Sequence, residues 1–400
     1  MSLNSTPQGV RIHIGLFGKR NAGKSSVINA ITNQEAAIVS DVAGTTTDPV
    51  FRPMEILPIG PCVLIDTAGL DDTGHLGELR INKSLDVLSK TDIALLVVDS
   101  NIGISKEDLS LIENFKSKNI PHIVVFNKID KLKDKSQVLA KAEKYIDSPI
   151  VSVSAMNKTG IESLKKEIIN AMPKGINEFQ LVSDLIEPDD FIVLVIPIDK
   201  AAPKGRLILP QQQVIRDILD SGAMTIVTKE DTLAYTLSNL STKPKMVITD
   251  SQVFENVNKD TPCDIPLTSF SILFARAKGD LDELIRGARA IDNLKDGDKV
   301  LIAEGCTHHR QDDDIGTFKI PNMIRKRTKK DITFDFTSGI SFSHDLTQYA
   351  LVVHCGACMM NRSAMLSRIQ SCKELDVPIV NYGVLMAYVT GILDRTLEVF

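Results

Sequence analysis

Cysteine and histidine side chains gather in two short segments in the C-terminal part of the sequence. Cys306 and His308 form the first segment, and His354, Cys355 and Cys358 form the second. A Cys-x-x-Cys pair presents two thiolates from one tight turn, and thiolates with imidazoles are ligands that soft metals prefer. These two segments hold three of the six cysteines of the chain. The pattern therefore predicts a metal centre whose ligands come from two separate loops.

A glycine-rich segment near the N-terminus, GKRNAGKS, has the spacing of a phosphate-binding P-loop. It lies between a predicted strand and a predicted helix, which is the context in which this pattern binds nucleotides. Gly18 and Gly23 let backbone N–H groups wrap around phosphates, and the helix N-terminus favours negative charge. Lys24 is expected to supply a cation to the β- and γ-phosphates. Ser25 offers its hydroxyl to magnesium, with Ser26 beside it.

A second motif, DTAG at residues 66–69, follows the predicted strand 63–66. An aspartate at this position can bind magnesium through a water molecule, and we assign that part to Asp66. The backbone N–H of Gly69 can sense the γ-phosphate. Together with the P-loop, this motif predicts that a nucleoside triphosphate is bound as its magnesium complex.

Two further motifs at strand ends predict which base is bound. Asn127, Lys128 and Asp130 form an NKID motif, and Asp130 can accept two hydrogen bonds from N1 and N2 of guanine, which adenine does not offer. Ser154 and Ala155 follow the next strand and are expected to place a backbone N–H near guanine O6. Because the four motifs occur in this order, the sequence predicts GTP rather than ATP as the ligand.

Size and composition indicate a cytoplasmic protein of several domains. At 400 residues the chain is expected to divide into two or three domains, and 43% hydrophobic with 24% charged residues is typical of globular proteins. The net charge of −5 argues against a nucleic-acid partner. The sequence has no apolar run near the roughly 18 residues of a membrane helix, and its start lacks the pattern of a secretory signal. We therefore expect a cytoplasmic protein with no membrane and no nucleic-acid partner.

Apolar runs alternate with amphipathic segments, which predicts an α/β fold with parallel sheets covered by helices. Residues 1–173 are expected to form a doubly wound, mostly parallel P-loop domain. A small α/β domain at 180–262 has no catalytic set that we can identify and is expected to serve assembly. Residues 265–400 are expected to form a third α/β domain that binds the metal. Its predicted strands 299–303 and 350–353 each run into one cysteine segment, so the ligands should meet at the carboxyl edge of this sheet.

In the four nucleotide motifs the first domain resembles the translation-factor-type GTPases related to the tRNA-modifying TrmE/MnmE proteins. The segment GTTTD at residues 44–48 is similar to their switch I motif, and the resemblance implies that Thr46 binds magnesium. Asn21 matches the asparagine that helps to bind potassium in that group. The resemblance thus implies a GTPase that potassium stimulates.

At one position this sequence has a different residue type from many other GTPases. Leu70 follows the DTAG motif, where they carry a glutamine that orients the attacking water. A leucine cannot orient water, so intrinsic hydrolysis is expected to be slow. Glu78 could take this part, as its counterpart does in the tRNA-modifying relatives, although an exposed helical glutamate without a catalytic part is the alternative. The predicted catalytic set consists of Lys24, Thr46, Gly69 and Glu78.

Two kinds of metal centre suit the cysteine and histidine segments. Zinc would take four of these five side chains and form a closed structural site. An iron–sulfur cluster would use the three thiolates and leave one iron with an exchangeable ligand. The candidates for that open position are water, His308, His309, His354 and Glu304. His308 and His354 could instead support the site without binding the metal.

Over its whole length, the sequence resembles the HydF family, the GTPase maturation factors of FeFe-hydrogenase. The resemblance is carried by the N-terminal GTPase motifs, a middle assembly domain, and a Cys-x-His segment followed by His-Cys-x-x-Cys. It implies that Cys306, Cys355 and Cys358 bind a 4Fe–4S cluster with one exchangeable site. It also implies that the middle domain mediates homodimerisation.

The same resemblance implies the function of a scaffold. Such a protein receives a transient diiron precursor from two radical-SAM maturases and delivers it to apo FeFe-hydrogenase. GTP and its hydrolysis to GDP would act as a switch that orders the loops around Thr46 and Gly69. The alternative is an RNA-modification or ribosome-assembly GTPase with a structural zinc domain. That function predicts a basic surface, which the net charge of −5 does not support.

Overall fold

The computed structural model describes residues 7–33, 49–67, 86–132, 146–172, 180–198, 207–305, 314–339, 342 and 345–400. The chain divides into two compact units, Met1–Glu178 and Phe179–Phe400. Each unit is an α/β structure, as the sequence predicts. Among the described residues, no helix is long and apolar enough to cross a membrane.

Within the described part of the first unit, six strands form one sheet in the order β2-β3-β1-β4-β5-β6. The strands are β1 (Ile12–Phe17), β2 (Val50–Ile56), β3 (Gly60–Asp66), β4 (Ile93–Asp99), β5 (His122–Asn127) and β6 (Ile150–Ser152). All neighbours are parallel except β2 and β3. The prediction of a doubly wound, mostly parallel sheet is confirmed, and β3 ends at Asp66 as predicted.

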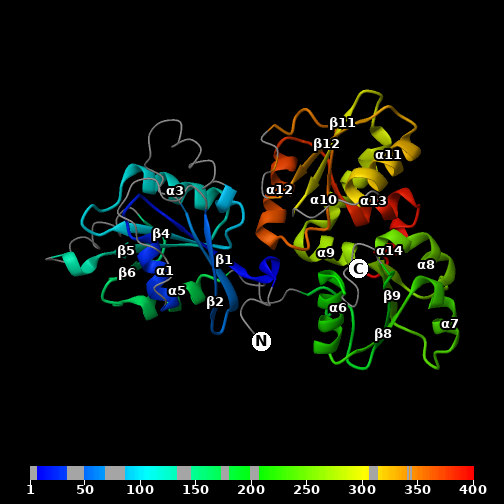
Figure 1. The fold of residues 1–400 in the computed structure, drawn as a ribbon, viewed down its shortest axis with the longest axis horizontal. Helices are drawn as coiled ribbons and strands as arrows, with labels where there is room; N and C mark the ends of the chain where they lie inside the picture. The colour runs from blue at the N-terminus through cyan, green and yellow to red at the C-terminus, as the bar shows by residue number, and fades with distance from the viewer. Residues whose placement is uncertain are drawn as a thin grey trace. The chain divides into compact units, whose positions relative to one another are not determined.

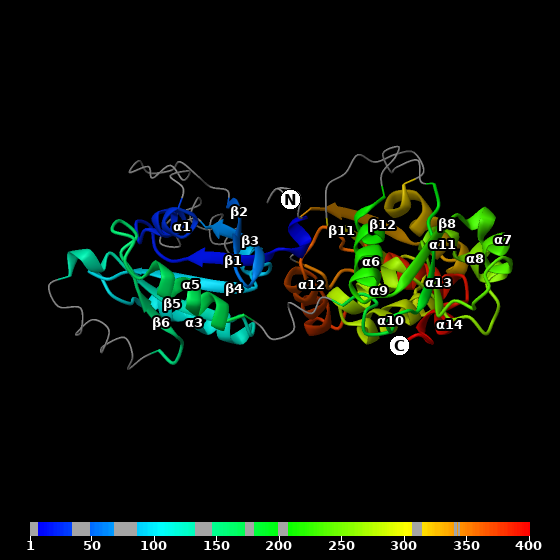
Figure 2. The same cartoon turned by 90° about the horizontal axis from the view of Figure 1, so that it is seen from below.

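Helices cover both faces of this sheet. They include α1 (Lys24–Thr32), α3 (Lys106–Ser117) and α5 (Ile161–Asn170). Val27 of α1 and Leu164 of α5 are buried against one face, whereas Ile112 and Phe115 of α3 are buried against the other (Figure 1; Figure 2). A strand covered on both faces is apolar throughout, which is why the run IALLVVD of β4 was recognisable in the sequence.

The described part of the second unit contains two sheets of four strands each. The first, called the middle sheet, has the order β10-β9-β7-β8 and is parallel throughout. Its strands are β7 (Phe191–Val195), β8 (Met224–Thr228), β9 (Met246–Thr249) and β10 (Leu267–Ser269). The helices of this part are α6 (Leu209–Asp220), α7 (Leu233–Ser238), α8 (Phe254–Asp260) and α9 (Phe270–Lys278). The sequence placed the end of this small domain at residue 262. Strand β10 comes after residue 262 and pairs with β9, so the middle sheet extends past the predicted end.

The second sheet of this unit, called the C-terminal sheet, has the order β12-β11-β13-β14 and is also parallel throughout. Its strands are β11 (Lys299–Glu304), β12 (Thr333–Ser338), β13 (Leu351–His354) and β14 (Ile379–Asn381). Its helices are α10 (Leu281–Ala290), α11 (Ile320–Thr328), α12 (Arg362–Glu374), α13 (Tyr382–Val389) and α14 (Leu393–Leu397). The two strands that run into the cysteine segments, β11 and β13, are hydrogen-bonded neighbours.

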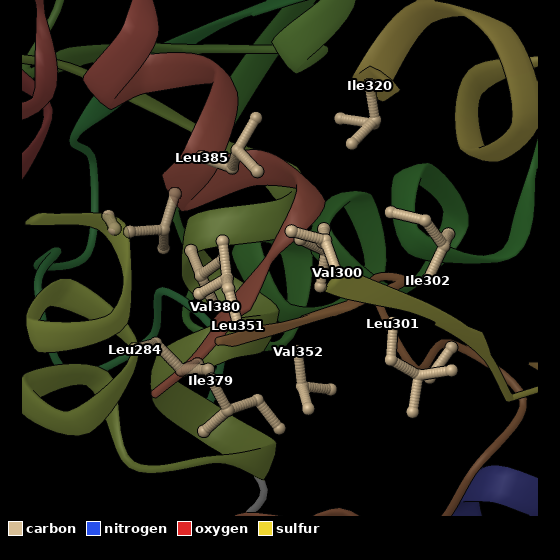
Figure 3. Packing of buried hydrophobic residues seen from close by; sticks show 14 of the residues in the cluster. Leu284, Val300, Leu301, Ile302, Ile320, Leu351, Val352, Ile379, Val380 and Leu385 are labelled. Atoms are coloured by element: carbon tan, nitrogen blue, oxygen red, sulfur yellow. The ribbon is translucent and has the colours of Figure 1, made fainter. Parts of the chain in front are cut away.

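Strands β11, β13 and β14 of the C-terminal sheet are buried on both faces, whereas the edge strand β12 is partly exposed. Along β11, Val300 and Ile302 point to the side of Ile320 and Leu385, whereas Leu301 points to the opposite side (Figure 3). Because side chains alternate along a strand, a strand between two helical layers must be apolar at every position. Full burial of a Leu or Ile side chain stabilises a fold by roughly 1.5–3 kcal/mol. This core therefore holds the ends of β11 and β13 firmly in register.

Helix α9 contributes to the cores of both sheets in the second unit. Phe270, Leu273 and Phe274 are buried with residues of the middle sheet. Ile272 and Ala275 are buried with residues of the C-terminal sheet. A helix that is apolar around its circumference is buried on all sides, and α9 lies between α6 and α10 in this way (Figure 1). The helix thus joins the two sheets into one compact unit.

A guanidinium group near the C-terminus links the same two parts of the second unit. Arg395, in α14, donates hydrogen bonds to the carbonyl oxygens of Asn258, Thr261 and Pro262 at 3.1, 2.9 and 2.8 Å. These carbonyls belong to the end of α8 and the segment that leads to β10. A planar cation with several donors suits such a group of convergent carbonyl oxygens.

We expect Arg395→Met to lower the free energy of unfolding of the second unit by about 2–3 kcal/mol, because it removes hydrogen bonds from a charged donor. Urea titration with hydrogen-exchange mass spectrometry of peptides from both sheets measures this change. The control is Arg216→Met, which removes an exposed ion pair with Asp220 within α6 and should leave the midpoint of unfolding close to that of the wild type. If the two substitutions lowered the free energy of unfolding equally, Arg395 would not be the stabilising link between the two parts of the second unit.

Candidate nucleotide and metal sites

Two glycines let the loop between β1 and α1 pass close to its neighbours. Gly18 has a φ of 135° and Gly23 a φ of 95°, in the region that favours glycine. A Cβ atom on Gly18 would lie 2.2 Å from the carbonyl oxygen of Val97, and one on Gly23 would lie 2.2 Å from Nδ2 of Asn127. Both positions therefore exclude a side chain, and the backbone is left to form the phosphate-binding turn.

Lys24 begins α1 and lies inside this turn. Its side chain is buried, and Nζ donates to the carbonyl oxygens of Gly18 and Lys19, at 3.0 Å in each case. Ser26 lies in the same first turn of α1. Asn21 is exposed, with a φ of 60°. The predicted P-loop is thus formed, with its lysine ammonium against the backbone that is to contact phosphate.

Ser25 and Asp66 come together from α1 and the end of β3. Ser25 Oγ donates to Asp66 Oδ2 at 2.5 Å. Burial raises the pKa of Asp66, and the hydrogen bond from Ser25 and the charge of Lys24 oppose this shift. A hydroxyl and a carboxylate at this separation are oxygen ligands of the kind that magnesium prefers. The structure therefore brings together two of the three residues that the sequence assigned to magnesium, Ser25 and Asp66.

The amide side chain of Asn127 ties the base-recognition motif to the P-loop. Its Nδ2 donates to the carbonyl oxygen of Ala22 at 3.1 Å, and its Oδ1 accepts from the backbone N–H of Ala155 at 3.1 Å. Asn127 is buried at the end of β5. One amide thus joins three nucleotide motifs that lie far apart in the sequence.

Lys128 adds a second tie to the same loop. Its Nζ donates to the carbonyl oxygen of Asn21 at 2.5 Å and to Oδ2 of Asp99 at 2.7 Å. Its backbone has a φ of 67°, which turns the chain sharply after β5. Lys128 thus supports the outer side of the P-loop, which the spacing of the sequence motif did not reveal.

Asp130 and Ser154 form the outer part of the base site. Ser154 Oγ donates to Asp130 Oδ1 at 2.5 Å, and the aspartate is exposed. The backbone N–H of Ser154 donates to the carbonyl oxygen of Thr159 at 3.0 Å, and that of Ala155 donates to Asn127. Both backbone N–H groups are therefore bonded within the protein. The predicted parts of Asp130, Ser154 and Ala155 in binding guanine stay predictions.

Several predicted residues lie outside the part of the chain that the structure describes. They are Thr46, Gly69 and Glu78 of the first unit, and Cys306, His308 and His309 of the second.

The ends of β11 and β13 place the second cysteine segment beside the entrance to the first. Ala303 pairs with His354, and the N–H of Cys355 donates to the carbonyl oxygen of Ala303 at 2.9 Å. Gly305, which precedes Cys306, donates its N–H to Cys355 Sγ at 3.1 Å. The described residues thus gather at the carboxyl edge of the sheet, as expected for a parallel α/β structure.

The Cys355–Cys358 turn is tight and open on one side. Ala357 has a φ of 52°, an uncommon value for a residue with a Cβ atom. Around Gly356, by contrast, a Cβ atom would meet no other atom within 4 Å. Burial raises the pKa of the Cys358 thiol, and the charge of Lys278 opposes this shift. The turn therefore has the conformation and the free space that a two-thiolate ligand pair requires.

His354 is held by the protein through both ring nitrogens. Nδ1 lies 2.8 Å from the carbonyl oxygen of Cys355 and donates to it, and Nε2 lies 2.7 Å from Arg368 Nη1 and accepts from it. Burial lowers the pKa of His354 to about 3, and the charge of Arg368 acts in the same direction. Arg368 also donates to the carbonyl oxygen of Gly339 at 2.8 Å. Because neither ring nitrogen is left for a metal, we correct the expectation that His354 can fill the open position and assign it a supporting part.

Glu304 ends β11 and points into the protein. Tyr382 Oη donates to its Oε1 at 3.3 Å. A Cβ atom on Gly316 would lie 2.7 Å from the same oxygen, so the chain passes closely over the carboxylate. Burial raises the pKa of Tyr382, and the charges of Glu304 and Cys355 add to this shift. Glu304 is thus near the cysteine turn, and its part as a ligand remains a proposal.

A lysine that the sequence did not single out contacts the cysteine turn. Lys278 ends α9, and its Nζ donates to the carbonyl oxygens of Ala357, Cys358 and Met360 at 3.3, 3.1 and 2.7 Å. Burial lowers its pKa to about 8, and the charges of Cys358 and Cys355 oppose this shift. In sequence, Lys278 resembles any cation in the last turn of a helix, so no local pattern could reveal its partners.

The donor set of this region fits thiolate ligation of a metal centre. Among the described residues, no three histidine, cysteine, aspartate or glutamate side chains are placed to hold one metal ion. The predicted set requires Cys306, which lies outside those residues. Cys355 and Cys358 lie on one turn with free space beside Gly356, and the N–H of Gly305 is directed at a sulfur atom. Backbone N–H donors of this kind stabilise the negative charge of sulfur ligands.

Comparisons with known proteins match the three sheets one by one. The family described as 50S ribosome-binding GTPase matches residues 13–128. The Hydrogen maturase F dimerization domain matches residues 181–279. The Hydrogen maturase F tetramerization domain matches residues 282–399.

Two curated relatives and one solved structure illustrate the likeness of the GTPase part. The tRNA modification GTPase MnmE of Aquifex aeolicus is 37% identical over 168 residues, 42% of this chain and 36% of that protein. GTPase Der of Persephonella marina is 34% identical over 169 residues, 39% of this chain and 38% of that protein. The chain thus spans little more than a third of the length of these relatives. A structure of Aquifex aeolicus Era bound to GDP and aluminium fluoride covers 54% of this chain and 93% of its own, with 22% identity and a TM-score of 0.37.

The fold and the nucleotide site define a P-loop GTPase domain followed by two further α/β parts. GTP, GDP and magnesium are the ligands expected of such a domain. Because the GTPase domain is followed by both the dimerization and the tetramerization domains of Hydrogen maturase F, the chain belongs to the HydF family of hydrogenase maturases.

We expect Asn127→Asp to weaken binding of both GTP and GDP by about tenfold to a hundredfold, because it removes the hydrogen bond to Ala22 that ties the base motif to the P-loop. Stopped-flow measurements with fluorescent nucleotides check this. Asn119→Asp, at an exposed position before β5, is the control and should leave affinity unchanged. An Asn127→Asp variant with wild-type affinity would show that the tie is not needed.

Proposed function

We propose that this chain is a maturation GTPase of FeFe-hydrogenase that acts as a scaffold and carrier for its metal cofactor. The observation that carries the proposal is the Cys355–Cys358 turn at the carboxyl edge of the C-terminal sheet, in a chain with Hydrogen maturase F domains. The adjacent end of β11 leads directly to Cys306. In this proposal the GTPase domain regulates the scaffold rather than carrying out metabolic turnover.

The proposed cluster site uses Cys306, Cys355 and Cys358 as its thiolate ligands. A 4Fe–4S cluster bound by three thiolates supplies one iron with an exchangeable position, which can anchor another metal unit. The candidates for that position are Glu304 and His308, together with water. His354 fixes the backbone of Cys355, because its Nδ1 donates to that carbonyl oxygen. The diiron precursor is the cargo of the scaffold in this account.

The nucleotide site is proposed to work as a switch. Ser25 and Asp66 lie within hydrogen-bond distance, which supports a magnesium site between them. Thr46 would complete this site, and the N–H of Gly69 would sense the γ-phosphate, so that hydrolysis releases both loops. Asn21 is proposed to bind potassium. Glu78 is proposed to orient the attacking water, because Leu70 cannot do so.

The partners in this proposal follow from the scaffold function. The chain would self-associate through its dimerization and tetramerization domains, receive the diiron precursor from radical-SAM maturases, and deliver it to apo FeFe-hydrogenase in the cytoplasm. The alternative is an RNA-modification or ribosome-assembly GTPase with a structural zinc domain. The likeness to MnmE covers 42% of this chain and therefore supports a shared GTPase domain rather than a shared substrate.

Metal content tests the proposed cluster most simply. After anaerobic reconstitution with iron and sulfide, we expect about four iron and four sulfide per chain and an EPR signal on reduction. Cys355→Ser and Cys358→Ser should each lose most of this iron. Cys263→Ser is the matched control, because Cys263 is an exposed cysteine of the same unit and should keep full iron content. Stoichiometric zinc without an EPR signal would favour the alternative function.

We expect Lys24→Ala to abolish GTP hydrolysis while the iron content stays at the wild-type level, because Lys24 lies in the first unit and the cysteine turn in the second. Phosphate release and iron content measured on the same samples check this. Lys165→Ala, which removes a partly buried lysine paired with the exposed Glu162 on α5, should change neither quantity. Loss of iron in Lys24→Ala would show that the two sites are not separable.

A further inference from the structure

Lys278 is a nearly inaccessible cation at the junction of α9 and the cysteine turn. Its side chain is among the largest fully buried ones, at 1% exposure. The three N–H bonds of an ammonium group match the three carbonyl oxygens of Ala357, Cys358 and Met360. These carbonyls belong to the turn itself and to the residue two positions after it. One side chain thus fixes the backbone of the segment that carries two of the proposed cluster ligands.

The ammonium charge of Lys278 is buried, so its surroundings must offset the cost of removing it from water. Burial of an ammonium costs several kcal/mol, and hydrogen bonds to neutral carbonyls offset only part of that cost. Lys278 Nζ also lies 5.3 Å from the centroid of the Phe274 ring, which offers a further weak attraction. An iron–sulfur cluster held by thiolates carries net negative charge and would lie against the same turn. A buried cation beside it offsets that charge, which a neutral side chain of the same length could not do.

The helix that carries Lys278 is rigidly placed by two cores. Phe270, Leu273 and Phe274 anchor α9 in the core of the middle sheet, and Ile272 and Ala275 anchor it in the core of the C-terminal sheet. Asn381, at the end of β14, adds a hydrogen bond from Nδ2 to the carbonyl oxygen of Ser271 at 3.1 Å. The ammonium therefore has little freedom to follow a displaced turn. The turn is held in a position that the dimerization domain, which ends at residue 279, helps to define.

We infer that Lys278 is a positioning residue of the cluster site: it fixes the Cys355–Cys358 turn through three backbone carbonyls and supplies a cation that offsets the negative charge of the thiolate-bound cluster. The inference rests on the proposed cluster function. It assigns to Lys278, the last residue of α9 and the next to last of the dimerization domain, a direct part in the metal site of the following domain. Neither the cysteine spacing nor the ligand set includes this residue.

Two measurable consequences distinguish the proposed role of Lys278 from that of a buried lysine that serves packing alone. If the charge acts on the cluster, its loss makes the cluster harder to reduce, so the midpoint potential of Lys278→Met becomes more negative. If the hydrogen bonds fix the turn, its loss lets the turn exchange its backbone protons faster, even without metal. A lysine that serves packing alone would change neither the potential nor the exchange of this one segment.

The experiment compares full-length wild type with Lys278→Met, Lys278→Gln and Lys278→Arg. Each is reconstituted anaerobically with iron and sulfide and titrated redox-potentiometrically by EPR. Hydrogen exchange of peptides that contain residues 355–361 is measured on the metal-free proteins. The control is Arg362→Met, which removes a cation at the start of α12 that bonds to α9 through the carbonyl oxygen of Ala277 at 3.2 Å. Within the described part of the chain, this side chain is not among the donors to the three turn carbonyls.

We expect a more negative potential in Lys278→Met and Lys278→Gln, and a potential near that of wild type in Lys278→Arg and Arg362→Met. Loss of iron to a chelator should be at least about tenfold faster in Lys278→Met, because the turn loses hydrogen bonds from a charged donor. Lys278→Gln keeps a donor and decides the matter if Lys278→Met does not fold. Wild-type potential and wild-type exchange in both neutral variants would overturn the inference. Wild type that binds no iron would instead overturn the proposed function, while the exchange of the metal-free turn would still test the positioning by Lys278.

Discussion

Parallel strands end at the same edge of a sheet, and both proposed sites depend on this constraint. In the first unit, β1, β3 and β5 end at the P-loop, at Asp66 and at Asn127, so motifs that are far apart in sequence become neighbours. In the second unit, β11 and β13 end together, and the N–H of Gly305 reaches the sulfur of Cys355. The apolar cores on both faces of each sheet hold these strand ends in register. The residues of the two proposed sites thus gather at two sheet edges because backbone hydrogen bonding and burial fix the ends of the strands.

Helix α9 is the element that makes the second unit one body. Its aromatic residues Phe270 and Phe274 pack in one core, and Ile272 and Ala275 pack in the other. Its last residue, Lys278, bonds to the cysteine turn. Self-association through the dimerization domain could therefore bear on the cluster site without any movement of the GTPase domain.

The sequence predicted what local patterns determine. Apolar runs at residues 299–303 and 350–353 located the strands β11 and β13, because buried parallel strands are apolar on both faces. It did not locate β2 and β12, the edge strands VFRPMEI and TFDFTS, whose polar residues face outward. Glycine spacing located the P-loop, and cysteine spacing located the turn at residues 355–358 on which the metal site is proposed. The pairing of His354 with Arg368, and of Lys278 with the turn carbonyls, depends on tertiary packing that no spacing reveals, and it moved His354 from the ligand set to the supporting residues.

The central claim is that the cysteine edge of the C-terminal sheet holds an iron–sulfur cluster with one open position. Mössbauer spectroscopy of protein reconstituted with isotopically enriched iron tests it most directly, because the method reports every iron in the sample. The account predicts one 4Fe–4S cluster per chain, with the spectrum of a single iron changing when a small exogenous ligand is added. Iron bound only as isolated ions, or a cluster in which all four irons are indifferent to the added ligand, would contradict it.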